Sequence, residues 1–334
     1  QSGNISVPEC DPANGIKIAV VGSGPAGLSF AGDMAKKGFD VTVFEDLHEI
    51  GGVLKYGIPE FRLPNAIVDV EIENLQKMGV KFITDCIVGK TISVKNLEEQ
   101  GFRGFFVGSG AGLPNFMNIP GENALNIMSS NEYLTRVNLM DAANPHTDTP
   151  INLGKKVVVV GGGNTAMDSC RTAKRLGAEV TLVYRRSEAE MPARLEEVKH
   201  AKEEGINFMT LHNPKEYEAD EKGAVKAVVL DVMQLGEPDA SGRRRPEATG
   251  ETITIECDQV IVAVGVSPNP LVPQSIEGLE LGRKNTIAVN EQMQSSQPEI
   301  YAGGDIVRGG ATVILAMGDG RKAAENMAKQ LSGK

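Results

Sequence analysis

The sequence has few cysteines and no long hydrophobic run. Its four cysteines lie far apart in 334 residues, and none forms a C-x-x-C pair. Local signatures of a metal cluster or of dithiol redox chemistry are therefore missing, and reduced thiols in a cytoplasmic protein are the simplest interpretation. No run of about 18 apolar residues occurs, so no membrane span is predicted. The first ten residues lack the charged and apolar regions of a signal peptide.

Basic patches and histidines are also scarce. The net charge is −10, with acidic residues spread along the chain, and no basic stripe interleaved with aromatic residues suggests a nucleic-acid partner. The four histidines lie in no arrangement typical of a catalytic triad, and we predict no catalytic side chain; they are His48, His146, His200 and His212. With 41% hydrophobic and 23% charged residues, the chain has the composition of a globular protein long enough for two domains.

One pattern occurs twice. Residues 16–22 form an apolar, β-branched run that predicts a buried parallel strand. A glycine-rich turn at 22–27, a helical stretch and a second strand at 40–44 come next. The same order recurs from residue 155, with its glycine-rich turn at 161–166. Two strand–turn–helix–strand units predict an α/β protein with two Rossmann-like dinucleotide-binding domains.

The remaining segments suggest how these domains are connected. Strand-like runs at 102–110 and 259–265 come after the two units, and the chain from residue 300 reads as a strand, a glycine-rich loop and a long helix. This last segment has no nucleotide turn of its own, so we expect it to complete the first domain. The first domain would comprise 1–150 and 267–334, with the second, 151–266, inserted. Residues 207–256 alternate in polarity and predict antiparallel strands appended to the second domain.

The first glycine turn has the context that its motif requires. Gly22 allows a tight turn, Gly24 lets the backbone approach a pyrophosphate, and Gly27 lets helix and strand pack closely. The N–H groups at the helix start would stabilise the phosphates. Glu45, at the end of the next strand, is placed to accept hydrogen bonds from ribose hydroxyls. The alternative is a purely structural turn with a surface glutamate.

The second turn differs in the residues at the end of its next strand. Gly161 and Gly163 are followed by Ala166, an accepted variant of the motif. Where the first unit has Glu45, this one has Arg185 and Arg186. Guanidinium groups bind a 2′-phosphate, which a carboxylate would repel, so NADPH is favoured over NADH. Two alternatives stay open: the arginines face solvent or pair with nearby glutamates at 188 and 190, or Arg186 alone makes the contact.

Two nucleotide sites in one chain suggest hydride transfer between a nicotinamide and a flavin, a step that needs no acid, base or nucleophile from the protein. The C-terminal segment supplies electrostatics for the flavin. Asp305 comes directly after Gly304 at the end of a strand and could bind the ribityl chain or a flavin phosphate. A helix starting near residues 311–313 would favour an anionic reduced flavin. The alternative is that Asp305 acts only as a turn or cap residue.

Several longer motifs resemble one family. GSGPAGL, GGVLKYGIPEFRLP, GGGNTAMDSCRTAKRLGAEVTLVYRR with SEAEMPAR, AVGVSPNP and YAGGDIVRGGATVILAMGDGRKAAENM are similar to the glutamate synthase small-subunit (β-subunit) family. The resemblance covers residues 16–331. It extends to the large subunit of electron-bifurcating ferredoxin:NADP oxidoreductase and to the flavin part of dihydropyrimidine dehydrogenase.

The resemblance implies two sets of binding residues. For FAD these are Gly22, Gly24, Gly27, Glu45, Gly52, Leu54, Arg62, Gly304, Asp305 and Thr312. For NADPH they are Gly163, Asn164, Thr165, Arg185 and Arg186. Neighbouring candidates in the same turns are Pro25, Ala26, Gly110, Gly265 and Ala311.

Two departures from the family pattern affect the prediction. The family usually carries a cysteine-rich iron–sulfur domain before the first strand, whereas about 15 residues and the single Cys10 precede it here. The chain is then either trimmed or descended from a shorter relative. The family's A-T-G turn is replaced by Gly108-Ser109-Gly110 after Val107, a mild change.

The resemblance implies electron delivery to a partner, either the glutamate synthase large subunit or another iron–sulfur or flavin protein. Three alternatives remain: the flavin module of a bifurcating enzyme, a disulfide reductase lacking C-x-x-C, or a nucleotide-sensing subunit that keeps the fold without the chemistry.

Overall fold

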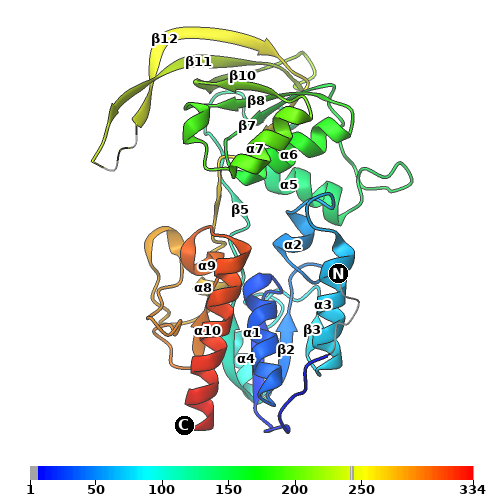
Figure 1. The fold of residues 1–334 in the computed structure, drawn as a ribbon, viewed down its shortest axis with the longest axis vertical. Coiled ribbons are helices and arrows are strands. Elements are labelled where there is room, and N and C mark those ends of the chain that lie inside the picture. Colours follow the sequence, from blue (N-terminus) through cyan, green and yellow to red (C-terminus); the bar gives the residue numbers. More distant parts are fainter. Residues whose placement is uncertain (1–6, 241, 243, 334) are drawn as a thin grey trace. The chain divides into compact units, whose positions relative to one another are not determined.

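The computed structural model describes residues 7–240, 242 and 244–333. The chain forms two compact units (Figure 1). The first comprises Gln1–Lys55, Glu60–Leu113 and Val266–Lys334; the second comprises Tyr56–Pro59 and Pro114–Gly265. The second unit is thus inserted into the first, as predicted, but it begins near residue 114 rather than 151. The reason is that the segment before residue 151 contains β6 (Ile127–Ser129), an edge strand of the second unit's sheet.

The first unit is built on a five-stranded sheet with the order β15-β4-β1-β2-β3. Every neighbouring pair in this sheet is parallel. The C-terminal strand β15 pairs with β4, so the end of the chain completes the first unit as expected. The strands are β1 (Lys17–Val21), β2 (Asp40–Phe44), β3 (Lys81–Ile83), β4 (Phe102–Val107) and β15 (Ile300–Ala302).

Two long helices of the first unit pack closely on each other. A Cβ added to Gly320 of α10 would lie 2.3 Å from the carbonyl oxygen of Ala26 in α1, and Phe30 of α1 stacks on Phe106 of β4 at 4.4 Å between ring centroids. The helices are α1 (Pro25–Lys36), α2 (Val53–Tyr56, which ends in the second unit), α3 (Asn65–Lys77), α4 (Val94–Glu99), α8 (Leu271–Gln274), η3 (Arg283–Asn285), α9 (Asp305–Arg308) and α10 (Val313–Ser332).

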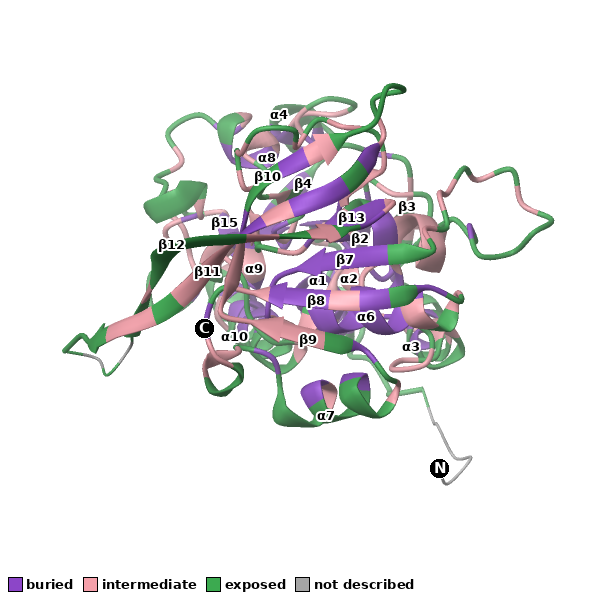
Figure 2. Ribbon diagram, turned by 90° about the horizontal axis from the view of Figure 1, so that it is seen from above, coloured by how far each residue is buried: buried purple, intermediate pink, exposed green. Residues whose placement is uncertain are grey.

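The second unit repeats this plan with the order β6-β13-β7-β8-β9, again all parallel. Its other strands are β7 (Lys156–Val160), β8 (Glu179–Tyr184), β9 (Asn207–Thr210) and β13 (Gln259–Val262). Figure 2 shows buried residues along β7 and β8, consistent with their runs of valine and leucine. Its helices are α5 (Ser130–Leu134), η1 (Thr135–Leu139), α6 (Asn164–Arg175), η2 (Glu188–Glu190) and α7 (Leu195–Glu203).

The prediction of antiparallel strands over 207–256 is correct in part. The strands β10 (His212–Ala219), β11 (Val225–Pro238) and β12 (Arg244–Glu256) form a separate antiparallel sheet. The first predicted strand is wrong, because β9 pairs parallel to β8 and closes the main sheet. Leu211, with a φ of +58°, separates β9 from β10, and this left-handed residue ends one strand before the other begins. A short pair, β5 (Leu113–Pro114) and β14 (Val266–Ser267), lies where the chain passes from one unit to the other at residues 113–114 and 265–266.

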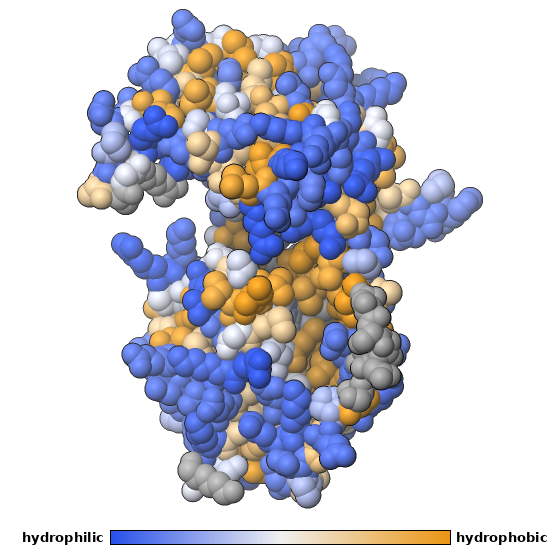
Figure 3. All heavy atoms as spheres, viewed as in Figure 1, coloured by the Kyte–Doolittle hydropathy of each residue, from blue (hydrophilic) through white to orange (hydrophobic). Residues whose placement is uncertain are grey.

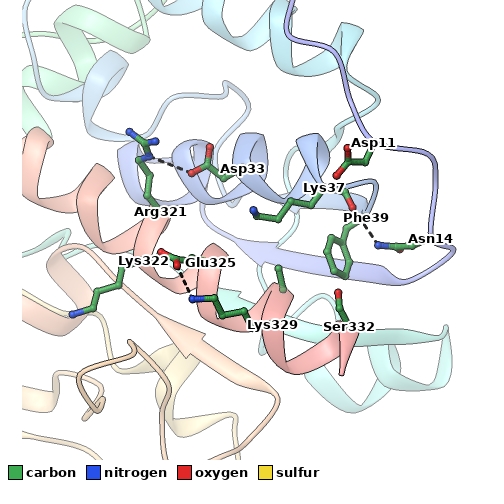
Figure 4. Close-up of a pocket in the computed structure, with 11 residues that line it drawn as sticks. Asp11, Asn14, Asp33, Lys37, Phe39, Arg321, Lys322, Glu325, Lys329 and Ser332 are labelled. Atoms are coloured by element: carbon green, nitrogen blue, oxygen red, sulfur yellow. Dashed lines mark hydrogen bonds and ion pairs between the residues drawn. The ribbon is translucent and has the colours of Figure 1, made fainter. Parts of the chain in front are cut away.

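Among the described residues, no helix is both long and apolar enough to cross a membrane. The first unit carries a surface hollow between the carboxyl-terminal halves of α1 and α10 (Figure 4). Its charged groups largely pair with each other, as in Arg321 with Asp33 and Lys329 with Glu325. The hollow lies at the opposite end of α1 from the first glycine turn, so it is not the nucleotide site that the sequence predicts.

Candidate dinucleotide-binding sites

The first glycine turn joins β1 to α1. Gly22 has a φ of +94°, and a Cβ there would lie 2.6 Å from the carbonyl oxygen of Gly108. At Gly27 a Cβ would lie 2.0 Å from the carbonyl oxygen of Gly22. Gly24, the N-cap of α1 just before Pro25, differs, because a Cβ there would meet nothing within 4 Å. Gly22 and Gly27 are thus required by the protein's own packing, while Gly24 faces open space.

Glu45 lies beside this turn, with 3% of its surface exposed. One carboxylate oxygen accepts hydrogen bonds from the backbone N–H and the hydroxyl of Ser23, and the other accepts one from the N–H of Leu47. Burial raises the pKa of Glu45 to about 7, and neighbouring Asp46 adds to the rise, against the lowering effect of these hydrogen bonds. The acid at the end of β2 therefore reaches the glycine turn, as the motif predicts.

Ser23 is a site residue that sequence reasoning missed. It is fully buried, and its hydroxyl accepts a hydrogen bond from the N–H of Gly51 while donating to Glu45. The Gly51–Gly52 loop lies over the turn, because a Cβ on Gly52 would be 2.9 Å from the Cα of Gly24. Ser23 occupies a variable position of the motif, so its type gave no signal. It joins the glycine turn, the acid and the Gly51–Gly52 loop.

Two further residues predicted to bind FAD follow this loop in the chain. Leu54 is partly buried and packs against the apolar cluster that includes Leu28 and Ile50. Arg62 is half-buried in the segment between α2 and α3. The predicted binding roles of both residues stay predictions.

The turn after β4 completes one wall of the first site. The N–H of Gly108 donates to the carbonyl oxygen of Val21, so this turn lies against the first glycine turn. The hydroxyl of Ser109 is buried without a hydrogen-bond partner among the described residues. Gly110 has a φ of +70° and open space where a Cβ would be. An unpaired hydroxyl and an open glycine are both consistent with a polar ligand at this position.

The C-terminal segment meets the same turn. A Cβ on Gly304, whose φ is +79°, would lie 3.1 Å from the Cβ of Ala26. Asp305 begins α9 and accepts a hydrogen bond from the N–H of Ala311 at 2.8 Å. Burial raises the pKa of Asp305, and repulsion from Asp319 adds to the rise. The hydrogen bond to Ala311 closes the loop and supports the turn role that the sequence left open for Asp305.

Helix α10 begins where the sequence predicts. Thr312 is its N-cap and accepts a hydrogen bond from the N–H of Leu315. Three apolar side chains of the first turns are exposed: Ile314 by 75%, Leu315 by 47% and Met317 by 43%. Figure 3 shows hydrophobic surface where α10 begins. A positive helix end beside exposed apolar side chains suits a flat ring that carries negative charge.

The second glycine turn joins β7 to α6 in the same way. A Cβ on Gly161 would lie 2.3 Å from the carbonyl oxygen of Ala263, and one on Gly162 would lie 2.7 Å from the ring of Tyr184. Gly163, the N-cap of α6, again has open space, and Ala166 is fully buried. The two turns therefore share one arrangement, with an open glycine at the helix start between packed neighbours.

Two further candidates flank this turn. Thr165 is exposed in the first turn of α6. Gly265, with a φ of +104°, lies in the turn after β13, and a Cβ there would lie 3.6 Å from the side-chain nitrogen of Asn115.

Asn164 has a structural role in addition to the predicted one. Its side-chain oxygen accepts a hydrogen bond from the N–H of Arg194 at 2.9 Å, and the N–H of Ala193 donates to the carbonyl oxygen of Gly162. The segment after β8 is thereby fastened to the glycine turn. This contact joins residues 30 positions apart, so no local pattern could have revealed it.

The two arginines after β8 lie in different environments. Arg185 is exposed, whereas Arg186 is 8% exposed and its Nε is buried without a partner among the described residues. The two glutamates considered as alternatives bind elsewhere: Glu188 pairs with Lys202, and Glu190 with Ser187 and Arg244. Among the described residues, the structure therefore records no ion pair between either arginine and these two glutamates.

All four cysteines lie in the described residues, and all are free. Cys10 is exposed, and the other three are buried. Burial raises the pKa of each buried thiol, to about 12 for Cys257. A thiolate is the reactive form of cysteine, so the structure does not favour the disulfide-reductase alternative.

We expect a thiol reagent such as Ellman's reagent to modify one cysteine of the native chain rapidly and the other three only on unfolding. The reason is that Cys10 alone is exposed. Stopped-flow absorbance with and without denaturant measures both phases. The variant Cys10→Ser should lose the rapid phase, and a rapid phase that persists in it would contradict the buried positions.

Together the two parallel sheets and their paired glycine turns define the class of the protein: a chain with two dinucleotide-binding units, one inserted in the other. Solved structures agree on this fold. FprA from Mycobacterium tuberculosis, in complex with NADPH, matches 96% of this chain and 85% of its own with a TM-score of 0.80 and 20% identity. Thioredoxin reductase from Lactococcus lactis matches with a TM-score of 0.73, also at 20% identity, covering 96% of this chain and all of its own.

Sequence comparisons then give the family. Residues 16–320 match the pyridine nucleotide-disulphide oxidoreductase family. The glutamate synthase [NADPH] small chain of Escherichia coli K12 is 36% identical over 94% of this chain and 68% of its own length. The NADP(+)-dependent formate dehydrogenase subunit beta of Moorella thermoacetica is 39% identical over 95% of this chain, which spans 44% of that relative. The chain belongs to the pyridine nucleotide-disulphide oxidoreductase family, in its glutamate synthase small-chain group. The predicted family and fold class are confirmed.

Proposed function

We propose that the first unit binds FAD, that the second binds NADPH, and that the chain passes electrons from NADPH through the flavin to an iron–sulfur partner protein. When bound, the nicotinamide supplies a hydride and the flavin accepts it. The protein's own task is then to bind and orient both cofactors.

One observation carries this proposal: both helix-start glycines face open space. Gly24 and Gly163 have nothing within 4 Å of a would-be Cβ, whereas the glycines before them are packed against backbone or ring atoms. Each precedes a helix of 12 residues, whose free N–H groups and dipole attract phosphate. The backbone at these positions is thus left free for a pyrophosphate to approach it.

In the first unit, the proposed roles are assigned by position. Glu45 accepts from the adenosine ribose, Asp305 binds the ribityl–phosphate part of FAD, and the start of α10 stabilises charge on the flavin ring. The unpaired hydroxyl of Ser109 fits a ligand that supplies its missing hydrogen bond. The other proposed FAD residues are Gly22, Gly24, Pro25, Ala26, Gly27, Gly52, Leu54, Arg62, Gly110, Gly304, Ala311 and Thr312.

In the second unit, the arginines after β8 bind the 2′-phosphate that distinguishes NADPH from NADH. The buried, unpaired Nε of Arg186 supports this role, because a buried N–H group without an acceptor is unfavourable in the protein alone. The glycine turn, with Gly163 and Thr165, binds the pyrophosphate, and Asn164 holds the loop beside it. Gly265 lies in the turn after β13.

The acceptor is proposed from the relatives. One is a glutamate synthase small chain and another a formate dehydrogenase beta subunit, so an iron–sulfur or flavin electron-transfer protein, such as the glutamate synthase large subunit, is the partner that we propose. Four free cysteines are consistent with a reducing, cytoplasmic environment.

An anaerobic titration tests the proposal. The purified chain, reconstituted with FAD, should lose its yellow flavin absorbance on addition of NADPH, and faster than with NADH at equal concentration. Reduced protein should then pass electrons to a ferredoxin-type acceptor but not to a disulfide substrate. Failure to bind FAD, or no bleaching by either nucleotide, would refute the proposal.

A further inference from the structure

Asp319, in the second turn of α10, has both carboxylate oxygens engaged by the glycine that precedes α9 and by the last residue of α9. It is 4% exposed. One oxygen accepts hydrogen bonds from the N–H of Gly304 at 3.0 Å and from Nε of Arg308 at 2.7 Å. The other accepts from a terminal nitrogen of Arg308 at 2.6 Å. A single buried carboxylate therefore fastens both ends of α9.

The turn that Asp319 fastens has a conformation that the chain would not hold unaided. Gly304 has a φ of +79° and a ψ of −151°, a region that is essentially restricted to glycine. Its neighbour Gly303 is so close to α10 that a Cβ there would lie 2.7 Å from the Cβ of Asp319. Glycine also loses more conformational freedom on ordering than any other residue. The hydrogen bond to Asp319 thus fixes the Gly303–Gly304 peptide, one residue before Asp305.

We propose that Asp319 is a positioning residue for the flavin: it holds the Gly303–Gly304 peptide and, through Arg308, the end of α9, and so keeps Asp305 between them in the geometry that binds FAD. The inference rests on the proposed function, in which Asp305 contacts the cofactor. Asp305 is closed onto its own loop by the N–H of Ala311, so the loop is fastened at both ends by carboxylates. In this proposal Asp319 acts on FAD through Asp305, whose position it fixes.

Charge, and not only shape, is what Asp319 contributes. An asparagine has one acceptor oxygen in place of two and adds an N–H group, which would face the guanidinium or the N–H of Gly304. Arg308 is 42% exposed, so it can turn to solvent once the carboxylate is lost. Hydrogen bonds to charged groups are worth more than neutral ones, so Asp319→Asn should loosen the turn while leaving the packing volume unchanged.

The test compares Asp319→Asn with a matched variant in the second unit. Glu197 pairs with Arg171 at 2.8 Å, and the two side chains are 12% and 8% exposed. Like Asp319→Asn, Glu197→Gln therefore removes the charge of a buried carboxylate that pairs with an arginine. We expect Asp319→Asn to weaken FAD binding by about tenfold or more, with NADPH binding unchanged. Glu197→Gln should lower thermal stability without changing FAD binding. FAD affinity is measured by flavin fluorescence and NADPH affinity by calorimetry.

A double-mutant cycle separates positioning from general stabilisation. If Asp319 acts through Asp305, the losses of FAD affinity in Asp305→Asn and Asp319→Asn will not add in the double variant; additive losses would overturn the inference. Should Asp319→Asn fail to fold, Arg308→Ala, which changes a partly exposed side chain, decides in its place. If Asp319→Asn, or Arg308→Ala in its place, binds FAD as tightly as wild type, this inference is overturned but the proposed function stands. If the wild-type protein binds no FAD, the proposed function is refuted.

Discussion

Alanine at Gly27 is expected to unfold the first unit, whereas alanine at Gly24 is expected to abolish tight FAD binding in a protein that stays folded. A Cβ on Gly27 would lie 2.0 Å from the carbonyl oxygen of Gly22 and 3.1 Å from its carbonyl carbon. These are backbone atoms at the end of β1, so α1 has to move away from the sheet. We expect a loss of more than ~3 kcal/mol in the free energy of unfolding, at the upper end for overpacked cores.

Gly24→Ala differs because its new methyl group meets no protein atom within 4 Å. The φ of −68° is accessible to alanine, and the change at the N-cap should alter stability by no more than about 1 kcal/mol. The methyl group instead occupies the space that we assign to the pyrophosphate, and it should weaken FAD binding by ~100-fold, or ~3 kcal/mol.

Urea denaturation of the apoproteins and FAD binding measured by fluorescence distinguish the two variants. Gly163→Ala, at the corresponding position of α6, is the control: it too has open space, and it should weaken NADPH binding and leave FAD binding unchanged. Equal FAD affinity in Gly24→Ala and wild type would show that no phosphate lies against this glycine.

Features encoded in a few consecutive residues could be predicted from the sequence, whereas contacts between distant residues could not. Both glycine turns, their flanking strands and the start of α10 are encoded in a few consecutive residues, and all of them lie where predicted. Ser23 and Asp319 were missed because their partners are distant in the sequence: Gly51 lies 28 positions from Ser23, and Gly304 lies 15 positions from Asp319. A buried serine or aspartate has no local signature of its partner.

The errors in strand assignment have the same cause. β6 joins the second unit only because it pairs with β13, more than 130 positions later, and this pairing moved the boundary from residue 151 to residue 114. β9 resembles the strands after it in its alternation of polar and apolar residues, but it is parallel to β8. Alternation of polar and apolar residues indicates that one face of a strand is exposed. This is true of many antiparallel strands and also of an edge strand in a parallel sheet, so alternation alone does not distinguish the two.

Arg185→Ala is expected to reduce kcat/KM for NADPH by ~10- to 100-fold and to leave kcat/KM for NADH almost unchanged. A charge-assisted hydrogen bond to phosphate is worth roughly 1.5–3 kcal/mol, and only NADPH carries the 2′-phosphate. Arg185 is exposed, so its removal should have little effect on stability. Flavin reduction followed by stopped-flow absorbance with each nucleotide gives both constants.

Arg186→Ala should show the same selectivity together with a loss of stability, because its side chain is 8% exposed and its removal leaves a cavity. Arg175→Ala is the matched control: Arg175 lies at the other end of α6 from the glycine turn and pairs with Glu204 at 2.9 Å, so neither nucleotide should be affected. A variant that loses NADPH and NADH activity equally would show that its arginine binds a part common to both. Comparing the two variants therefore decides which guanidinium binds the 2′-phosphate, the alternative that the sequence left open.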